Sequence, residues 1–215
     1  MMTNTTAAYD EAFLAQARRL GTSTLHEASG IPTTSVDPAI RTIWPGASIA
    51  GPAYPVECAP GDNLAIHIAM ESVPRGSVLV VSAAGFVAGY WGEVLTVAAE
   101  AAGVVGLVID GGVRDIAALT ARKFPVFARG ISVRGTLKDS APSVGRPFSF
   151  TGTPVASGDL VVADDDGVIV IPAERVKTTL SDGQARADKE AKMMEALAGG
   201  QSTLALLGLS RWRLV

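Results

Sequence analysis

The sequence has 215 residues, a formal net charge of -3 and 48% hydrophobic residues, which predicts one compact domain with a buried core. The slightly acidic balance argues against a nucleic-acid-binding surface, and no apolar run reaches the roughly 18 residues of a membrane span. The polar first ten residues do not resemble a signal peptide, and the single cysteine, Cys58, cannot form an internal disulfide. We therefore expect a soluble cytoplasmic protein without nucleic-acid or membrane partners.

The N-terminal quarter predicts helices followed by an interrupted strand. Apolar residues recur at helical spacing, and Thr22 or Ser23 is placed to cap the second helix. Gly51, Pro52 and Pro55 weaken the strand and favour a sheet edge or a bulge. The expected elements are a helix over 10–20, a short helix over 22–29, an irregular stretch over 31–45 and a strand over 47–56.

The central part alternates between helical and strand patterns. Short apolar runs alternate with helical periodicity, and Asp62 is a candidate N-cap. This β-α-β-α-β order favours a partly parallel sheet covered by helices, and hence an α/β fold. The expected elements are helices over 62–71, 91–102 and 116–122, and strands over 77–82, 104–109 and 125–128.

The second half predicts a mixed β region and a long helix. Asp164-Asp165-Asp166-Gly167 is typical of a tight turn, and it lacks the alternating ligands and distant Glu of a calcium loop. A long polar helix over about 173–198 is ended by Gly199 and Gly200. Short strands are expected over 149–151, 153–156, 160–163 and 168–171. With no linker or repeat evident, we expect a single domain over 1–215.

The most informative stretch runs from Gly103 to Asp115. A buried strand leads into Asp110-Gly111-Gly112 and then delivers Arg114 and Asp115 where ligands gather in α/β sheets. The glycines allow a sharp turn and the close approach of a ligand. The carboxylate of Asp115 suits Mg²⁺ or Mn²⁺, and the Arg114 fork suits a carboxylate or an enolate oxygen. A surface turn with a local ion pair remains the alternative.

A second candidate element is Gly92-Glu93-Val94-Leu95. A helix beginning near Trp91 would present free backbone N–H groups and so form an anion site, with Glu93 at its mouth. The alternative is an ordinary acidic residue in a first turn, where the helix dipole favours negative charge.

Together these residues resemble a known family. Glu93 is separated from Arg114 by positions 94–113, twenty residues, and Asp115 follows. This spacing is similar to the acidic-X20-Arg-Asp signature of the RraA-like class II pyruvate aldolases. Matching segments also occur in family order across most of the chain: Thr24-Leu25-His26-Glu27-Ala28, Pro60-Gly61-Asp62-Asn63 with His67, Gly135-Thr136-Leu137-Lys138, and Gly158-Asp159 with 164–167. The resemblance implies a layered α/β/β/α sandwich with a long C-terminal helix.

The resemblance also implies roles for individual residues. These are Asp115 as the protein ligand to Mg²⁺ or Mn²⁺, Glu93 as the acid holding metal-bound water, Arg114 on the keto oxygen and enolate of pyruvate, the backbone of Gly92, Val94 and Leu95 on the pyruvate carboxylate, Asn63 and Lys138 near the pocket, and Glu190 reaching the site of a neighbouring subunit. Family members are homotrimers or homohexamers with the active site between subunits.

The implied reaction is metal-dependent cleavage of a 4-hydroxy-2-oxo acid to pyruvate and a second oxo-acid. The substrates would be 4-carboxy-4-hydroxy-2-oxoadipate or 4-hydroxy-4-methyl-2-oxoglutarate, both connected with aromatic compound catabolism. Oxaloacetate decarboxylation leaves the same enolate, so it is expected as a side activity. The simplest base for the 4-hydroxyl is a metal-bound water relayed by Glu93. Glu93 and Ile31 depart from the nearest branch of the family, which leaves the choice of substrate open.

Two other functions compete with the aldolase interpretation. One branch of the family comprises non-catalytic regulators of a ribonuclease, in which the Asp after the central Arg is replaced; the presence of Asp115 favours an enzyme. A methyltransferase that uses S-adenosylmethionine is disfavoured because no Gly-rich loop follows a first strand. His67 can line the pocket or pack a helix, whereas His26 and Cys58 are interpreted as packing residues.

Overall fold

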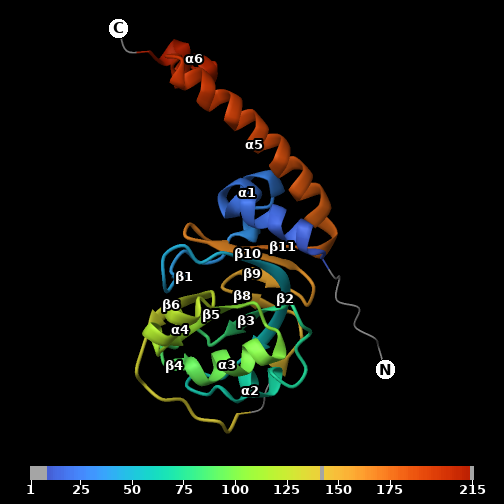
Figure 1. Ribbon diagram of the computed structural model, residues 1–215, viewed down its shortest axis with the longest axis vertical. Coiled ribbons are helices and arrows are strands. Elements are labelled where there is room, and N and C mark those ends of the chain that lie inside the picture. The colour runs from blue at the N-terminus through green and yellow to red at the C-terminus, as the bar shows by residue number, and fades with distance from the viewer. Residues whose placement is uncertain (1–8, 141–142, 214–215) are drawn as a thin grey trace.

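A mixed sheet organises the chain in the computed structural model, which describes residues 9–140 and 143–213 (Figure 1). In this described part the main sheet has nine strands, with the order β1-β6-β5-β3-β2-β10-β11, while β4 pairs with β5 and β7 with β2. β2, β3, β5 and β6 run parallel, whereas β1, β10 and β11 are antiparallel to their neighbours. The bounds are β1 Arg41–Thr42, β2 Ile49–Glu57, β3 Val78–Ser82, β4 Gly89–Trp91, β5 Gly106–Val113, β6 Val126–Ile131, β7 Ser143–Val144, β10 Leu160–Asp164 and β11 Gly167–Ile171, with a separate hairpin of β8 Phe148–Phe150 and β9 Thr153–Val155.

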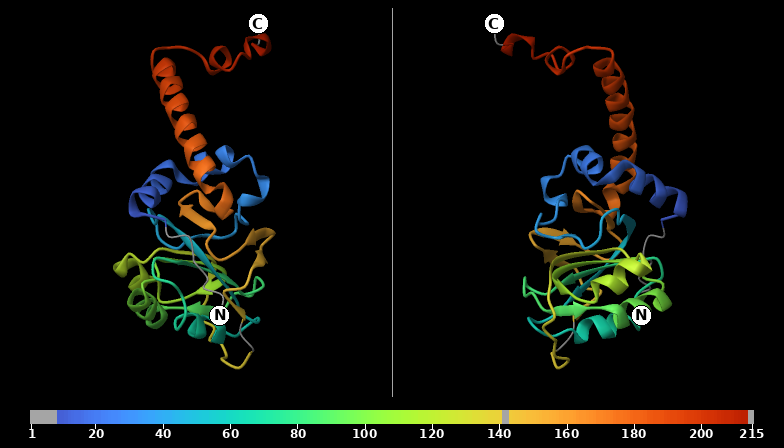
Figure 2. Two further views of the ribbon diagram at one scale, coloured as in Figure 1. Left: turned by 90° about the vertical axis from the view of Figure 1, so that its right-hand side faces the viewer. Right: turned by 60° about the vertical axis from the view of Figure 1, so that its left-hand side comes forward.

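Helices cover the two outer faces of the β structure. The group α2, α3 and α4 lies on one side, whereas α1 and α5 pack together on the other (Figures 1 and 2). Their bounds are α1 Glu11–Ser29, α2 Leu64–Ala69, α3 Glu93–Ala102, α4 Ile116–Arg122, α5 Val176–Ala198 and α6 Thr203–Leu206, with short 3-10 turns at Pro32–Thr34, Ala173–Arg175 and Ser210–Trp212.

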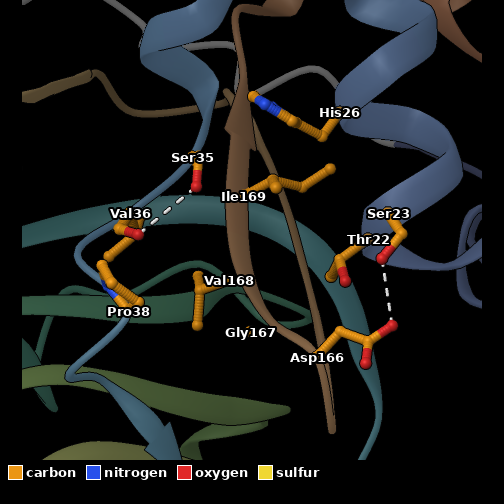
Figure 3. A pocket seen from close by; sticks show the side chains of 10 residues that line it. All are labelled: Thr22, Ser23, His26, Ser35, Val36, Pro38, Asp166, Gly167, Val168 and Ile169. Atoms are coloured by element: carbon orange, nitrogen blue, oxygen red, sulfur yellow. Dashed lines mark hydrogen bonds between the residues drawn. The ribbon is translucent and has the colours of Figure 1, made fainter.

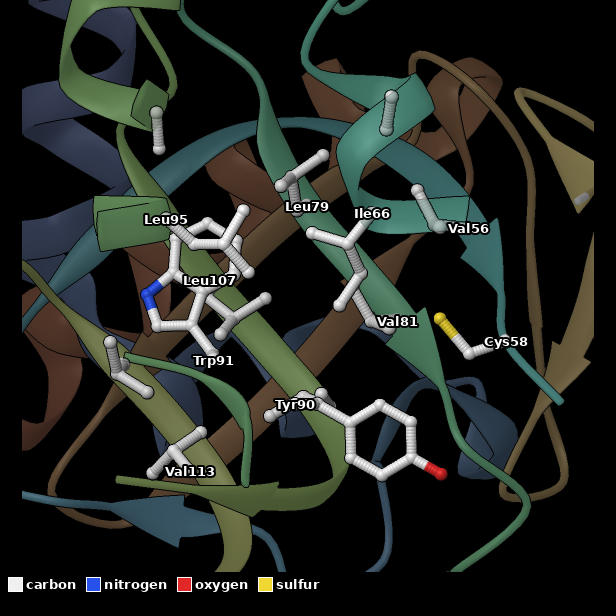
Figure 4. Close-up of a cluster of buried hydrophobic side chains, with 14 of the residues drawn as sticks. Val56, Cys58, Ile66, Leu79, Val81, Tyr90, Trp91, Leu95, Leu107 and Val113 are labelled. Atoms are coloured by element: carbon white, nitrogen blue, oxygen red, sulfur yellow. The ribbon is translucent and has the colours of Figure 1, made fainter. Parts of the chain in front are cut away.

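The strand side chains alternate between layers, which produces three apolar cores. In β3, Leu79 and Val81 face the α2–α4 layer (Figure 4), whereas Val78 and Val80 face a second core, which also contains residues of β10 and β11. In β11, Ile169 packs under α1 and α5 in the third core. This period-2 pattern confirms the layered α/β/β/α sandwich.

The Asp164–Gly167 turn joins two antiparallel strands, as expected, and it also anchors α1. Gly21 breaks the regular helix with φ 77° and ψ 166°, so the two predicted N-terminal helices are halves of one bent element. Asp164 accepts hydrogen bonds from the Thr22 N–H at 2.8 Å and from the Thr22 hydroxyl at 2.6 Å. The carboxylate therefore caps the second half of α1.

The strand over 47–56 was expected at a sheet edge or at a bulge, and this prediction was wrong. β2 lies inside the sheet, between β3 and β10, and it is buried along almost its whole length. Its prolines are tolerated because β2 changes partner along its length. Pro52 is the last residue paired with β10, β7 pairs only from Val56, and Pro55 lies between them. Few ladder hydrogen bonds from this side of the strand are therefore lost.

The expected turn at Gly111 and Gly112 was also wrong, because β5 continues through both residues to Val113. These two glycines are required because a side chain at either position would collide with a neighbouring segment. A Cβ on Gly112 would lie 2.5 Å from the Ala88 carbonyl oxygen, and one on Gly111 would lie 2.9 Å from the Ala83 Cβ. The glycines thus let the segment that contains β4 pack against β5. Trp91, predicted to begin a helix, is the last residue of β4.

The long C-terminal helix is confirmed, and its two halves have different surroundings. Its buried residues end at Gly183, and the rest of α5 extends away from the sandwich (Figure 2). The helix carries α6 and the exposed Trp212 at its far end. Among the described residues, no helix is both long enough and apolar enough to cross a membrane.

Candidate functional site

A cavity of about 290 Å³ lies where β4 and β5 end. Of the nine residues given a role in the sequence analysis, all except Glu93 and Glu190 line it: Asn63, Gly92, Val94, Leu95, Arg114, Asp115 and Lys138. The cavity also includes His67, which sequence reasoning left open, and Gly89, Tyr90, Gly135 and Thr136, which it missed. Gly135 and Thr136 belong to the same segment as Lys138 and could have been included on that ground.

Asp115 occupies the turn between β5 and α4. Its backbone is left-handed, with φ 59° and ψ 38°, a conformation that Asp adopts more readily than most residues. One carboxylate oxygen, Oδ2, accepts a hydrogen bond from the Glu93 N–H at 3.0 Å and lies 3.9 Å from Arg114 Nε. The side chain is 44% exposed, so the carboxylate is accessible from the cavity.

Gly92 brings the start of α3 against this carboxylate. Its φ of -161° is ordinary extended backbone, so torsion freedom does not explain the glycine. A Cβ there would lie 2.3 Å from Asp115 Oδ2. The absence of a side chain at Gly92 is therefore what allows Asp115 to reach the Glu93 N–H.

Arg114 is positioned by its main chain and by the stem of its side chain. Its N–H donates to the Trp91 carbonyl at 2.8 Å, which ties the end of β5 to β4. A Cβ on Gly89 would lie 2.9 Å from Arg114 Cδ, so the arginine stem packs directly over this glycine. The guanidinium side of the residue stays half-exposed, next to Asp115.

The N-terminus of α3 supplies main-chain donors. Thr96 closes the first turn by donating its hydroxyl to the Gly92 carbonyl at 3.0 Å, and it accepts from Trp91 Nε1 at 2.7 Å. The amides of Val94 and Leu95 precede the first intrahelical bond, and both residues line the cavity. The helix start thus offers N–H groups and a positive dipole end to an anion.

Asp62 holds the loop that carries Lys138. Its Oδ2 accepts hydrogen bonds from the Asp139 N–H at 2.6 Å and the Ser140 N–H at 3.0 Å, and its Oδ1 accepts from the Leu64 N–H. These amides, that of Leu64 first, lower the pKa of the Asp62 carboxyl. The segment resembling the family's Pro-Gly-Asp-Asn motif thus fixes one wall of the cavity.

Asn63 and His67 form the neighbouring wall. The Asn63 amide donates from Nδ2 to the Tyr90 carbonyl at 2.9 Å. Asn63 Oδ1 and His67 Nε2 are buried and have no hydrogen-bond partner among the described residues. Burial, and secondarily the positive charge of Lys138, lower the pKa of His67. The imidazole is therefore neutral near pH 7.

Glu93 contributes its backbone to the site, while its side chain lies elsewhere. The carboxylate pairs with Arg122 of α4 at 3.3 Å, and Arg122 also binds Glu100 at 3.0 Å. The Glu93 side chain is half-exposed and is absent from the cavity lining.

The remaining sequence candidates lie elsewhere. His26 lines a separate pocket of about 130 Å³ with Ser23 and Asp166 (Figure 3), and its Nδ1 is 2.8 Å from the Thr34 hydroxyl. Cys58 is buried in the core beside α2, and burial raises the pKa of its thiol to about 12, which supports packing over nucleophilic chemistry.

Glu190 lies on the projecting half of α5, where it pairs with Arg186 at 2.8 Å. This position lies beyond the last buried residue of the helix, Gly183.

The acidic side chains near the cavity determine which divalent cation it could hold. Within residues 9–140 and 143–213, no group of three or more His, Cys, Asp or Glu side chains could hold a metal ion. A closed zinc-type site is thus not built among these residues. Asp115 is the carboxylate of the cavity, and Mg²⁺ commonly binds through one or two carboxylates while keeping several waters. This residue set fits Mg²⁺ or Mn²⁺ held by Asp115, water and substrate oxygens.

Comparisons with known proteins agree with this fold. Residues 22–170 match the family described as RraA-like, Aldolase/RraA. A Halalkalibacterium halodurans protein named "Putative 4-hydroxy-4-methyl-2-oxoglutarate aldolase" is 34% identical over 183 residues, which cover 84% of this chain and 86% of that protein. An uncharacterized Pseudomonas syringae protein of known structure has a TM-score of 0.82 and 29% identity over 92% of this chain and 93% of its own. Streptomyces coelicolor RraAS2, described as an unusual member of the RNase ES inhibitor RraA protein family, has a TM-score of 0.75 and 25% identity, covering 86% and 97%.

Proposed function

Because the chain belongs to the RraA-like family, we propose that it is a carbon–carbon lyase that cleaves 4-hydroxy-2-oxo acids to pyruvate and a second oxo-acid. The candidate substrates are 4-hydroxy-4-methyl-2-oxoglutarate and 4-carboxy-4-hydroxy-2-oxoadipate. The observation that carries this proposal is the convergence of Arg114, Asp115 and the first-turn amides of α3 on one cavity. An accessible carboxylate, a guanidinium and free N–H donors are the groups needed to hold a 2-oxo acid and its enolate.

Each residue receives a role from its position. The amides of Val94 and Leu95 bind the carboxylate of the pyruvate unit, and Gly92 leaves room for this approach. Arg114 donates to the 2-keto oxygen, where negative charge grows as the enolate forms. Lys138 and Asn63, held by the Asp62 network, contact the rest of the substrate.

Mg²⁺ or Mn²⁺ is the proposed cofactor, held by Asp115. Such an ion acts as a Lewis acid on the keto and carboxylate oxygens of the substrate. Glu93 orders water near it after its half-exposed side chain turns away from Arg122. Oxaloacetate decarboxylation is the proposed side activity, because loss of CO₂ leaves the same pyruvate enolate.

A homotrimer or homohexamer is the proposed assembly, with Glu190 directed to a neighbouring site. Val94 in the cavity lining is 81% exposed, and Leu137, between the lining residues Thr136 and Lys138, is 71% exposed, so a second copy would cover apolar surface there. Gly183 is the last buried residue of α5, and the outer half of the helix, which carries Glu190, extends away from the sandwich (Figure 2).

The alternative function is that of a non-catalytic RraA-type regulator that binds a ribonuclease. The structural similarity to RraAS2 supports this alternative. The accessible carboxylate of Asp115 favours the enzyme, because a binding protein has no need of a metal-ligating group in this cavity.

Pyruvate release provides the test. Both aldol substrates and oxaloacetate would be incubated with the protein in Mg²⁺, in Mn²⁺ and after exhaustive chelation. We expect turnover that chelation abolishes and added metal restores. Activity that survives chelation would overturn the metal proposal. No turnover of any oxo-acid, together with tight ribonuclease binding, would establish the regulator instead.

A further inference from the structure

Two residues that line the cavity each have a buried polar atom without a partner in the described part of the chain. Among the described residues, neither Asn63 Oδ1 nor His67 Nε2 has a hydrogen-bond partner, although both are buried. A buried polar atom without a partner is destabilising, so such atoms point to a ligand, a water or a catalytic role. Both residues line the cavity that holds Arg114 and Asp115, which makes a bound substrate the natural partner.

The hydrogen bonds of Asn63 identify which of its atoms is free. The Tyr90 carbonyl can only accept, so the atom 2.9 Å away must be the amide nitrogen of Asn63. The remaining atom, Oδ1, can only accept, and it suits a hydroxyl or water in preference to a carboxylate.

His67 lies one helical turn after Asn63. Asn63 is the N-cap of α2 and His67 lies within the helix, and both residues line the same cavity. Burial and the nearby positive charge of Lys138 lower the pKa of His67, so the resting imidazole is neutral and one of its ring nitrogens has a free lone pair.

We propose that Asn63 and His67 form the subsite for the 4-hydroxyl of the substrate, and that His67 is the base for aldol cleavage. This inference rests on the proposed lyase function. Asn63 Oδ1 receives the hydroxyl as it binds, and His67 Nε2 then takes its proton. The C3–C4 bond breaks, its electron pair forms the pyruvate enolate, and C4–O becomes the carbonyl of the second oxo-acid. The imidazolium returns the proton to C3, so the histidine ends neutral and pyruvate gains its methyl hydrogen.

This assignment differs from the water relay through Glu93 that the sequence led us to expect. The Glu93 carboxylate is paired with Arg122 and is absent from the cavity lining, whereas His67 belongs to it. Glu93 keeps its proposed role of ordering water near the metal.

Comparing the two reactions of the proposed enzyme distinguishes the contribution of the base from that of the other residues in the site. Aldol cleavage needs the hydroxyl proton removed, whereas decarboxylation of oxaloacetate has no such proton. The two reactions share the enolate and its protonation at C3, and in decarboxylation water supplies that proton because His67 has not taken one from a hydroxyl. The experiment measures both reactions in His67→Gln and Glu93→Gln, with His26→Gln as the matched control in the separate pocket. For His67→Gln we expect aldol cleavage to fall by about 100-fold, while decarboxylation stays within about threefold. The control should retain both activities.

The outcomes are distinguishable. Equal loss of both reactions in His67→Gln, retention of both, or a selective aldol defect in Glu93→Gln alone would overturn the inference. Absence of both activities in the wild type would instead overturn the proposed function. Should His67→Gln fold poorly by thermal melting, His67→Ala with added imidazole gives a second test. The inference then requires imidazole to restore aldol cleavage without raising decarboxylation.

Discussion

Two acidic turns of this protein use their carboxylates in different ways. At the β10–β11 turn, Asp164 binds Thr22, both oxygens of Asp165 accept from the Gly46 N–H, and Asp166 accepts from Ser23. At the β5–α4 turn, Asp115 accepts one amide hydrogen bond through a single oxygen and faces a cavity. The run of three acids is the more conspicuous in the sequence, yet both oxygens of Asp164 and of Asp165 accept hydrogen bonds within the fold. Free hydrogen-bonding capacity therefore indicates a chemical site better than the number of acids does.

The largest effect is expected for Asp115→Asn. Asparagine tolerates the left-handed backbone and retains an acceptor for the Glu93 N–H, but it lacks the charge that would bind a cation. Pyruvate release should fall by on the order of 100-fold or more, since a Lewis acid contributes several kcal/mol to transition-state stabilisation. The melting temperature should stay within about 2 °C. Wild-type turnover in this variant would remove Asp115 from the role of ligand.

An intermediate effect is expected for Gly92→Ala. The new Cβ would be placed 2.3 Å from Asp115 Oδ2, so the carboxylate must move away from the Glu93 amide. We expect about a tenfold loss of kcat/KM and a loss of about 1–3 kcal/mol in the free energy of unfolding. Gly199→Ala is the control, because its Cβ meets nothing closer than 3.4 Å. Equal behaviour of the two variants in both assays would contradict the steric role given to Gly92.

The smallest effect on activity is expected for Asp164→Ala, which tests the structural turn. Loss of this cap on α1 should lower the free energy of unfolding by about 1–2 kcal/mol. Chemical denaturation measures this change, and kcat for pyruvate release should remain near the wild-type value. A selective loss of activity with unchanged stability would show that the two turns are not separate in function.

Much of the fold could be predicted because it depends on local patterns. The helix over 116–122 was placed with its observed bounds, and the alternating strands, the Asp164–Gly167 turn and the long C-terminal helix were recognised from periodicity and turn residues. The errors concern long-range packing. The interior position of β2 depends on its change of partner from β10 to β7, and the strand conformation of Gly111 and Gly112 depends on the segment around Ala88. Neither relationship is visible in a local window.

The site shows the same division. Spacing and family resemblance brought Arg114 and Asp115 together with the start of α3. The sequence could not show that Asp62 binds amides 77 and 78 positions away, nor that the Glu93 side chain pairs with Arg122. The vacant acceptor of Asn63 also depends on the placement of Tyr90, since an amide has no free atom until its partners are known.

The glycines of the cavity bear on how its specificity could diversify. Gly92 is buried against Asp115, and almost any substitution there would disturb the reacting end of the site. Gly135, across the cavity, is exposed and has empty space where a side chain would begin. New substrates are therefore most readily accommodated by enlarging residues on the Gly135 side. The reaction can stay the same while the segment around Gly135 varies. Natural variation and directed evolution can therefore change the substrate at this segment.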